Sequence, residues 1–115
     1  MIDFKKLEYD FGDDWDIFEE LVESYLGVYE EYLSNIDQGI KSGDFERVRI
    51  ESHTLKGIVA NFYCDDLKMK AFSLEDCGKK QNLTGATELF NDLKRLNSDV
   101  LHQLQSHIQT KKIAS

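Results

Sequence analysis

Proline is absent from this chain of 115 residues, and glycine occurs only seven times. The commonest helix breaker is therefore missing, and few residues are available for the tight turns of β-hairpins. Hydrophobic runs are also short, far below the roughly 20 consecutive apolar residues that a membrane-spanning helix needs. These absences argue against a β-rich fold and against a transmembrane segment, and they predict long helices.

Cysteine is scarce too, since Cys64 and Cys77 are the two cysteines of the chain. One possible pair makes no disulfide framework, and the spacing of the two residues matches no short metal-ligand pattern. We expect both to be free thiols.

Basic residues are outnumbered, with 14 Lys and Arg against 22 Asp and Glu, a formal charge of −8 and an isoelectric point near 4.8. Nucleic acids and anionic membranes attract basic surfaces, so we expect neither as a partner. The N-terminus carries no basic and then apolar leader, which favours a cytoplasmic protein. A hydrophobic share of 41% is too high for a disordered acidic tail.

Apolar residues recur at intervals of three and four along most of the chain, as on one face of an amphipathic helix. The pattern predicts a short helix around residues 4–11, a long helix over about 14–41, a third helix over about 45–62, a fourth over about 67–78 and a final long helix from 86 to about 109. Short connections favour an all-α fold, an antiparallel four-helix bundle with a short extra N-terminal helix. Residues 1–115 are predicted to form one domain, with a core of about 14–109.

Polar residues mark the predicted helix ends. Asp14 is predicted to cap the second helix, and Ser42-Gly43-Asp44 to end that helix and cap the third. Asp65 or Asp66 is predicted to cap the fourth helix, and Thr84 the last. We expect the polar tail from Thr110 to Ser115 to fray. Such a tail, together with a start at Met1, favours a free-standing protein.

The three histidines are the candidates for chemistry. With a rotation of about 100° per residue, His53 lies about 140° from the centre of the apolar stripe of the third helix, so it is predicted to face solvent. That stripe comprises Phe45, Val48, Ser52, Leu55, Val59 and Phe62. His102 and His107 are assigned to the solvated face of the final helix, too far around it from each other to chelate a metal together.

The neighbours of His53 on its helix face are unusual for a purely solvated surface. Gly57 costs about 1 kcal/mol relative to alanine inside a helix, which indicates that something approaches closely there. Ile50 and Ala60 lower the polarity of the face. Arg49, Lys56 and Asn61 share the same side, and the plain alternative is a solvated helix face.

Motifs of other chemistries are missing from the sequence. It has no glycine-rich phosphate loop, no Gly-x-Ser-x-Gly elbow and no evident Cys/His nucleophile pair. Inward-facing Glu-x-x-His ligand pairs are missing as well. We therefore expect no cofactor or metal of the chain's own, and an autonomous kinase or phosphatase is disfavoured.

The segment His53-Thr54-Leu55-Lys56-Gly57 resembles the phosphoacceptor segment of histidine-containing phosphotransfer (HPt) domains. The resemblance extends to Gly43-Asp44-Phe45, Asn61, Leu67, Ala71 and Leu74-Glu75. One position departs from the family pattern: Tyr63 stands where a glycine is usual, which puts the geometry of the local turn in question.

The resemblance implies a phosphorelay intermediate without kinase activity. His53 would take a phosphoryl group from the aspartate of one receiver domain and pass it to another, with Lys56 holding the phosphoryl oxygens and Gly57 leaving room for them. The implied partners are response-regulator receiver domains and a hybrid sensor histidine kinase, with Mg²⁺ on the receiver. We expect the chain to act as a monomer.

The fourth helix is predicted to run antiparallel to the third, so that residues near 74 come level with His53. Glu75 would then orient the other ring nitrogen and Lys79 would assist the phosphate, or both would belong to an ordinary salt-bridge face. Ile50, Gly57 and Ala60 form a predicted apolar platform for the receiver, flanked by Phe72 on the fourth helix. The main rival function is a helical-bundle interaction module with an unused histidine, which the departure at Tyr63 favours.

Overall fold

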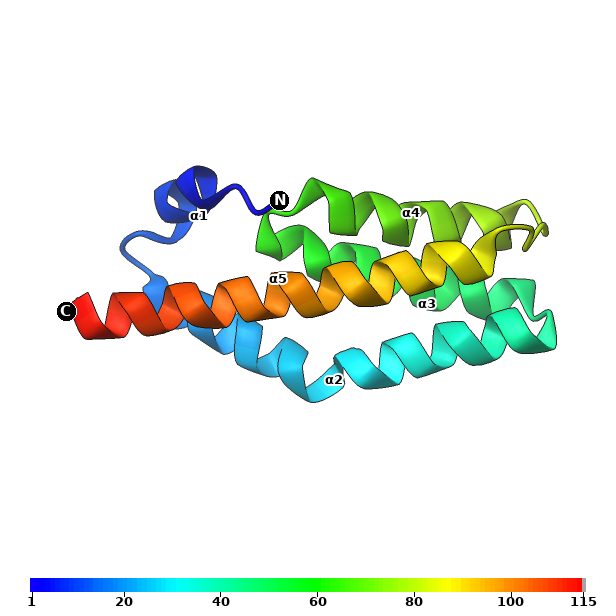
Figure 1. Ribbon diagram of the computed structural model, residues 1–115, viewed down its shortest axis with the longest axis horizontal. Coiled ribbons are helices and arrows are strands. Elements are labelled where there is room, and N and C mark those ends of the chain that lie inside the picture. Colours follow the sequence, from blue (N-terminus) through cyan, green and yellow to red (C-terminus); the bar gives the residue numbers. More distant parts are fainter. Residues whose placement is uncertain (115) are drawn as a thin grey trace.

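The computed structural model describes residues 1–114, and helices account for most of them. The helices are α1 (Phe4–Phe11), α2 (Trp15–Ser42), α3 (Phe45–Val59), α4 (Asp65–Lys79) and α5 (Ala86–Ala114), with a 3₁₀ helix over Ala60–Phe62. Figure 1 shows α2 to α5 running alternately in opposite directions along a molecule of 49 × 22 × 19 Å. The predicted all-α bundle with an extra N-terminal helix is confirmed.

The core lies between the predicted apolar faces of the four long helices. Its fully buried side chains each contribute about 1.5–3 kcal/mol through removal from water, and the largest of them are Phe18, Tyr25, Ile36, Leu55, Phe62, Leu67, Leu74, Leu93 and Leu104. The apolar stripe did not predict that Asn97 is buried. The hydroxyl of Tyr25 donates a hydrogen bond of 2.5 Å to its Oδ1, which offsets the cost of burying that polar atom.

Gly78 allows the end of α4 to lie directly against the start of α3. A Cβ atom at Gly78 would come within 2.6 Å of both the backbone nitrogen of Arg49 and the carbonyl oxygen of Phe45. Only a residue without a side chain fits such a contact between two backbones. The close approach fixes the spacing of the α3–α4 hairpin.

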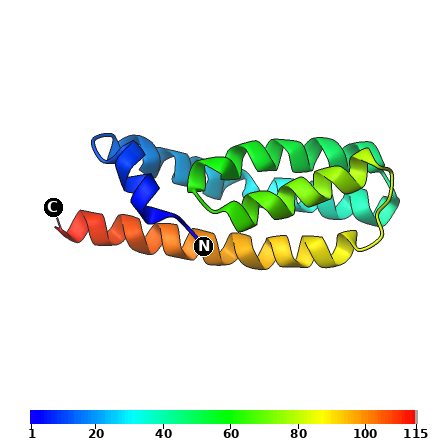
Figure 2. The ribbon, with the colours of Figure 1, turned by 90° about the horizontal axis from the view of Figure 1, so that it is seen from above.

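The N-terminal segment closes the end of the bundle opposite the α4–α5 loop (Figure 2). Leu7 of α1 is completely buried. Ile2 and Cys64 form an isolated antiparallel bridge, and the backbone N–H of Asp3 donates to the carbonyl oxygen of Tyr63 at 2.7 Å. The segment is thus tied by its backbone to the link between α3 and α4.

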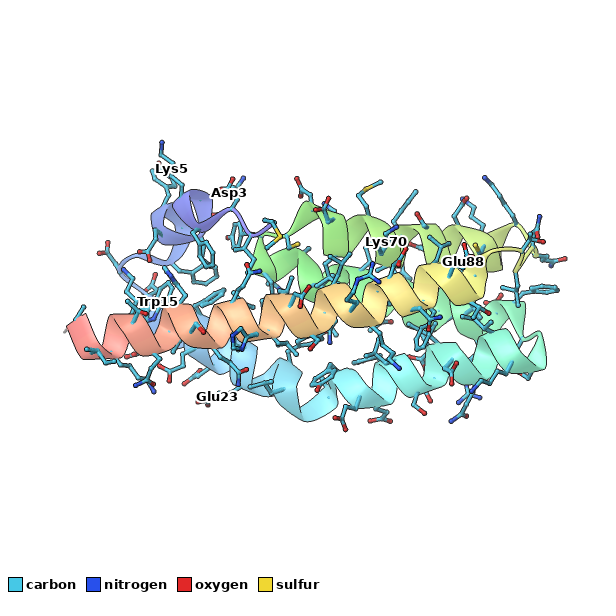
Figure 3. The ribbon with its side chains drawn as sticks, viewed as in Figure 1. Asp3, Lys5, Trp15, Glu23, Lys70 and Glu88 are labelled. Atoms are coloured by element: carbon cyan, nitrogen blue, oxygen red, sulfur yellow. The ribbon has the colours of Figure 1, made fainter. Side chains whose placement is uncertain are left out.

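The prediction that His107 lies on the solvated face is wrong. Its Nε2 lies 2.8 Å from Oε1 of Glu8, its ring lies 4.5 Å from that of Phe4, and the ring of Trp15 is 5.5 Å away. Figure 3 shows Trp15 at the end of the molecule where α1, α2 and α5 meet. α1 folds over α5 there, a tertiary contact that the periodicity of α5 does not encode. His102 is exposed, as predicted.

Two predicted helix caps hold and two do not. Asp14 precedes α2, and Asp44 accepts the Arg47 N–H to cap α3, after Gly43 has ended α2 in the left-handed conformation. Asp65, however, is already helical, and Cys64 takes the cap position of α4. Thr84 does not cap α5: the carbonyl of Gly85 accepts the first helical bond, from Leu89.

The third and last helices also end differently from the prediction. α3 is α-helical only to Val59 and then tightens into the 3₁₀ helix. The tail does not fray within the described residues, because α5 continues through Thr110 to Ala114, supported by the ion pair between Lys111 and Glu8 at 2.7 Å. Ser115, the last residue of the predicted tail, lies outside the described residues.

Both cysteines are free thiols, Cys64 buried and Cys77 half-buried, as predicted. Among the helices described over residues 1–114, none combines the length and the apolarity that crossing a membrane requires. The same residues bring together no group of three His, Cys, Asp or Glu side chains suited to a metal ion.

Candidate functional site

His53 stands out from the middle of α3, with 64% of its side chain exposed. Its Nδ1 lies 2.7 Å from Oε2 of Glu75 on α4. The other ring nitrogen, Nε2, is on the opposite edge of the imidazole. One edge of the ring is therefore anchored to the protein, and the other is open to a partner.

Glu75 holds two groups with one carboxylate. Besides its contact with His53, its Oε1 accepts a hydrogen bond of 2.6 Å from Nζ of Lys56. The side chain of Glu75 is only 17% exposed. Burial alone raises the pKa of Glu75, but the hydrogen bonds and charges of Lys56 and His53 outweigh burial and hold that pKa below its ordinary value.

The ionisation of Glu75 determines the tautomer of His53. A carboxylate can only accept hydrogen bonds, so the proton between the two groups resides on Nδ1 of the imidazole. The lone pair of Nε2 is then available on the exposed edge. The arrangement has the logic of a buried carboxylate that orients a catalytic histidine.

The local sequence explains why these three side chains meet. His53 and Lys56 are three positions apart on α3, so they are neighbours on one helix face. The turn at residues 60–64 reverses the chain, and the backbone contact at Gly78 holds α4 against α3. Glu75 is thereby placed level with His53 and Lys56, one turn before Gly78.

Lys56 has a second contact, with Phe72. Its Nζ lies 5.2 Å from the centroid of the Phe72 ring, within the range of a cation–π interaction. The ring is 46% exposed. The ammonium of Lys56 thus lies between the carboxylate of Glu75 and an aromatic face on the surface.

The remaining residues predicted around His53 are accessible. Ile50 is 48% exposed, and Ala60 is exposed in the 3₁₀ helix. A Cβ atom at Gly57 would meet no atom within 4 Å, so the space over that part of α3 is open. Asn61 is also exposed, and its Nδ2 donates to the carbonyl of Ile58 at 3.1 Å.

Arg49 and Lys79 lie at the edge of the site. Arg49 forms an ion pair with Glu46 on its own helix. Within residues 1–114 no carboxylate pairs with Lys79, which is exposed at the end of α4. Arg49, Lys79 and Glu75 line an open hollow of about 700 Å³ together with Gly43, Asp44, Phe45, Glu46, Gly78 and Gln81.

Tyr63 adopts the left-handed conformation, with φ 58° and ψ 34°, which glycine takes at no steric cost. Its hydroxyl donates to Oδ2 of Asp10 at 2.7 Å, and its ring meets the ring of Phe11 edge-on at 6.3 Å. Burial, and then the hydrogen bond to Asp10, raise the pKa of Tyr63 to about 12. Tyr63 therefore adopts the backbone conformation of the turn that a glycine would adopt, and its side chain also contacts Asp10 and Phe11 of α1.

Two features of the site were not predicted from the sequence. Met69 on α4 is exposed one turn before Phe72 and extends the apolar surface, which its spacing from Phe72 could have revealed. The antiparallel run of the two helices predicted Glu75 level with His53, but it did not predict that the same carboxylate also binds Lys56.

Two of three comparisons with known proteins found a match, one with a family model and one with a solved structure. The family model described as Hpt domain matches residues 20–110. The crystal structure of histidine-containing phosphotransfer protein B (HptB) from Pseudomonas aeruginosa PAO1 is similar to the chain with a TM-score of 0.85 and 21% identity, over 95% of each chain. Comparison with curated proteins gave no match. The structural likeness concerns the fold, whereas the family match spans the helices that carry His53 and Glu75.

Proposed function

The chain belongs to the Hpt domain family, and from that premise we propose that His53 is the phosphoacceptor of a phosphorelay. Histidine phosphotransfer in two-component signalling is the role of this family, whose members are carriers rather than enzymes and interact with receiver domains and kinases. The supporting observation is the contact of 2.7 Å between Nδ1 of His53 and Glu75, which leaves Nε2 free on an exposed edge.

In the proposed transfer, the lone pair of Nε2 attacks the phosphorus of a receiver's aspartyl phosphate. The Nε2–P bond forms, the P–O bond breaks, and the aspartate carboxylate of the receiver leaves. Nδ1 keeps its proton, so the imidazole of His53 gains positive charge, and the carboxylate of Glu75 faces that charge. Such preorganised charge stabilises the transition state without reorganisation. Passing the group to a second receiver reverses these steps.

Lys56 and Gly57 serve the phosphoryl group and its donor in this proposal. The ammonium of Lys56 is a compact cation that neutralises phosphoryl oxygens as a point charge. Gly57 leaves open the space that the receiver must enter.

The receiver is proposed to rest on the exposed apolar residues Ile50, Ala60 and Phe72, since exposed apolar groups rimmed by polar ones mark partner sites. Arg49, Asn61 and Lys79 supply the polar rim. The donor is proposed to be a hybrid sensor histidine kinase that carries a receiver domain, and the acceptor a response regulator. Mg²⁺ belongs to the receivers in this scheme, and the chain acts as a cytoplasmic monomer.

The test is incubation with a phosphorylated receiver domain and Mg²⁺, followed by mapping of the label. We expect one acid-labile, alkali-stable phosphoryl group on His53. Labelled ATP alone should leave the chain unlabelled, because the sequence has no nucleotide-binding motif. Label on another residue, or from ATP alone, would contradict the proposal. The rival interaction module predicts receiver binding with no label on any histidine.

A further inference from the structure

Within the described residues 1–114, Lys56 is the one cation that touches both Glu75, the anchor of His53, and the exposed apolar surface. Its Nζ donates to Glu75 at 2.6 Å and lies over the ring of Phe72 at 5.2 Å from the centroid. Phe72 is exposed, but the ammonium of Lys56 occupies one face of its ring.

We propose that phosphorylation of His53 draws Lys56 away from Phe72 and uncovers the aromatic ring on the docking surface. The phosphorylated and unphosphorylated chains then present different surfaces to a receiver. The inference rests on the proposed function of His53 and adds a regulation of that site. Whether His53 is phosphorylated determines whether the ring of Phe72 is free to contact a receiver.

The competition for the ammonium favours the phosphoryl group. A phosphoryl group carries a charge of about −1.5 to −2 and three strong acceptor oxygens, whereas an aromatic face attracts a cation only through its quadrupole. His53 and Lys56 are three positions apart on α3 and share the carboxylate of Glu75, so the new anion forms beside the ammonium.

The other contacts of the site change less. The ammonium of Lys56 has three donors, so it can keep Glu75 while it turns toward the phosphoryl oxygens. Glu75 in turn remains bound to Nδ1 of His53, because the phosphorylated imidazole keeps its proton there and gains positive charge. The contact with Phe72 is the one that no hydrogen bond maintains, so it is the one that is lost.

The consequence concerns which form a receiver prefers. The unphosphorylated chain offers a ring beneath a cation, and the phosphorylated chain offers a bare apolar ring next to the phosphoryl group. An apolar contact that is stronger in the loaded state favours docking of the accepting receiver before transfer and its release after transfer.

Proton NMR of the full chain tests the proposal through the ε-methylene protons of Lys56. Over the Phe72 ring these protons are shifted upfield by the ring current, relative to the Phe72→Leu variant. The chain is then phosphorylated with phosphoramidate, in which the Nε2–P bond forms, the P–N bond of the reagent breaks and ammonia leaves. We expect the upfield shift to disappear on phosphorylation and to return as the phosphohistidine hydrolyses.

The His53→Gln variant is the matched control, because the reagent is present but the acceptor is not, and its upfield shift should persist throughout. A chain that mass spectrometry shows to be phosphorylated on His53, but whose Lys56 protons keep their upfield shift, would overturn the switch and leave the proposed function intact. A chain that takes up no phosphoryl group on His53, from phosphoramidate or from a receiver, would overturn both.

Discussion

His53 and Lys56 donate to the two oxygens of the same carboxylate, that of Glu75, at 2.7 and 2.6 Å. Glu75 therefore couples the acceptor to the cation that would neutralise the transferred group. Substitutions at the three positions are expected to be non-additive, because residues in one hydrogen-bond network share their energy.

The first prediction concerns the acceptor. His53→Gln should abolish labelling by a phosphorylated receiver while the bundle stays folded, because an exposed side chain contributes little to stability. His102→Gln is the control, an exposed histidine on α5, and it should be labelled as the unaltered chain is. Phosphate-affinity electrophoresis and circular dichroism measure the two properties. Label that persists on the His53→Gln variant would contradict the assignment of His53 as the phosphoacceptor.

The second prediction concerns charge at Lys56. Lys56→Ala should slow transfer by about tenfold or more, about 1.4 kcal/mol of barrier for each factor of ten, and change receiver affinity little. Lys56→Arg keeps the charge and should retain more of the rate. Rapid-quench kinetics separates transfer from binding. An unchanged rate in the alanine variant would return Lys56 to the role of a surface salt bridge.

The third prediction concerns Glu75 and pH. The pKa of Glu75 in the folded chain lies below its ordinary value of 4.5, so its ionised form stabilises the fold above pH 4.5 and that contribution is lost as the pH falls through the folded pKa. The difference in unfolding free energy between the unaltered chain and Glu75→Gln should be constant near neutral pH and shrink below about pH 4.5. Urea titrations at a series of pH values measure it.

Glu75→Gln should also slow phosphoryl transfer at neutral pH, by about tenfold or more, because a neutral amide does not stabilise the positive charge that develops on the imidazole. Asp76→Asn is a suitable control, since Asp76 pairs with Lys80 on the same helix and takes no part in the site. If the two variants transfer equally fast, Glu75 has only a structural role.

The fourth prediction concerns the docking surface. Ile50→Asp and Ala60→Arg should weaken receiver binding and slow transfer, with helicity and melting temperature nearly unchanged, because both residues are exposed. Calorimetric titration with a receiver measures the binding. Ile17→Asp is a matched control, an exposed isoleucine on α2. If binding is unaffected at both sites, the receiver docks elsewhere.

The fifth prediction contrasts two helical glycines. Gly78→Ala should destabilise the fold by about 1–3 kcal/mol, because the added Cβ meets backbone atoms that cannot yield easily. Gly57→Ala should stabilise it by about 0.5–1 kcal/mol, since alanine is the better helix former and the space is open. Gly57→Ala should nevertheless transfer more slowly, because it narrows the approach of the receiver. Thermal melts and transfer assays on both variants test the contrast.

Features carried by local sequence could be predicted. The period of the apolar residues gave the five helices, Gly43 and Asp44 marked the end of α2 and the start of α3, and rotation along α3 placed His53 on the outside. Each of these depends on a few residues that are close in the chain, and the physics of a single helix determines them.

Features that depend on contacts between helices could not be predicted in the same way. His107 was misplaced because α1 covers one end of α5, and a helical period cannot show which polar position another helix will cover. The cap of α4 was misassigned because Cys64, whose side chain makes no capping hydrogen bond, takes that position; it lies in an isolated bridge with Ile2, a contact distant in the chain. Glu75 was predicted to lie level with His53, but its second contact, with Lys56, was not predicted and depends on the close approach of α3 and α4 at Gly78.

The close pairing of α3 with α4 also has a consequence for the order of folding. His53 meets Glu75 across only 22 positions of the chain, whereas Asp10 meets Tyr63 across 53 and Glu8 meets His107 across 99. Loop-closure entropy rises with the length enclosed, and local contacts form fastest. These contacts of α1 lie on the link between α3 and α4 and on α5, both of which follow it in the chain. We therefore expect the hairpin that bears the histidine to pair first, and α1 to complete its docking only when α5 is in place.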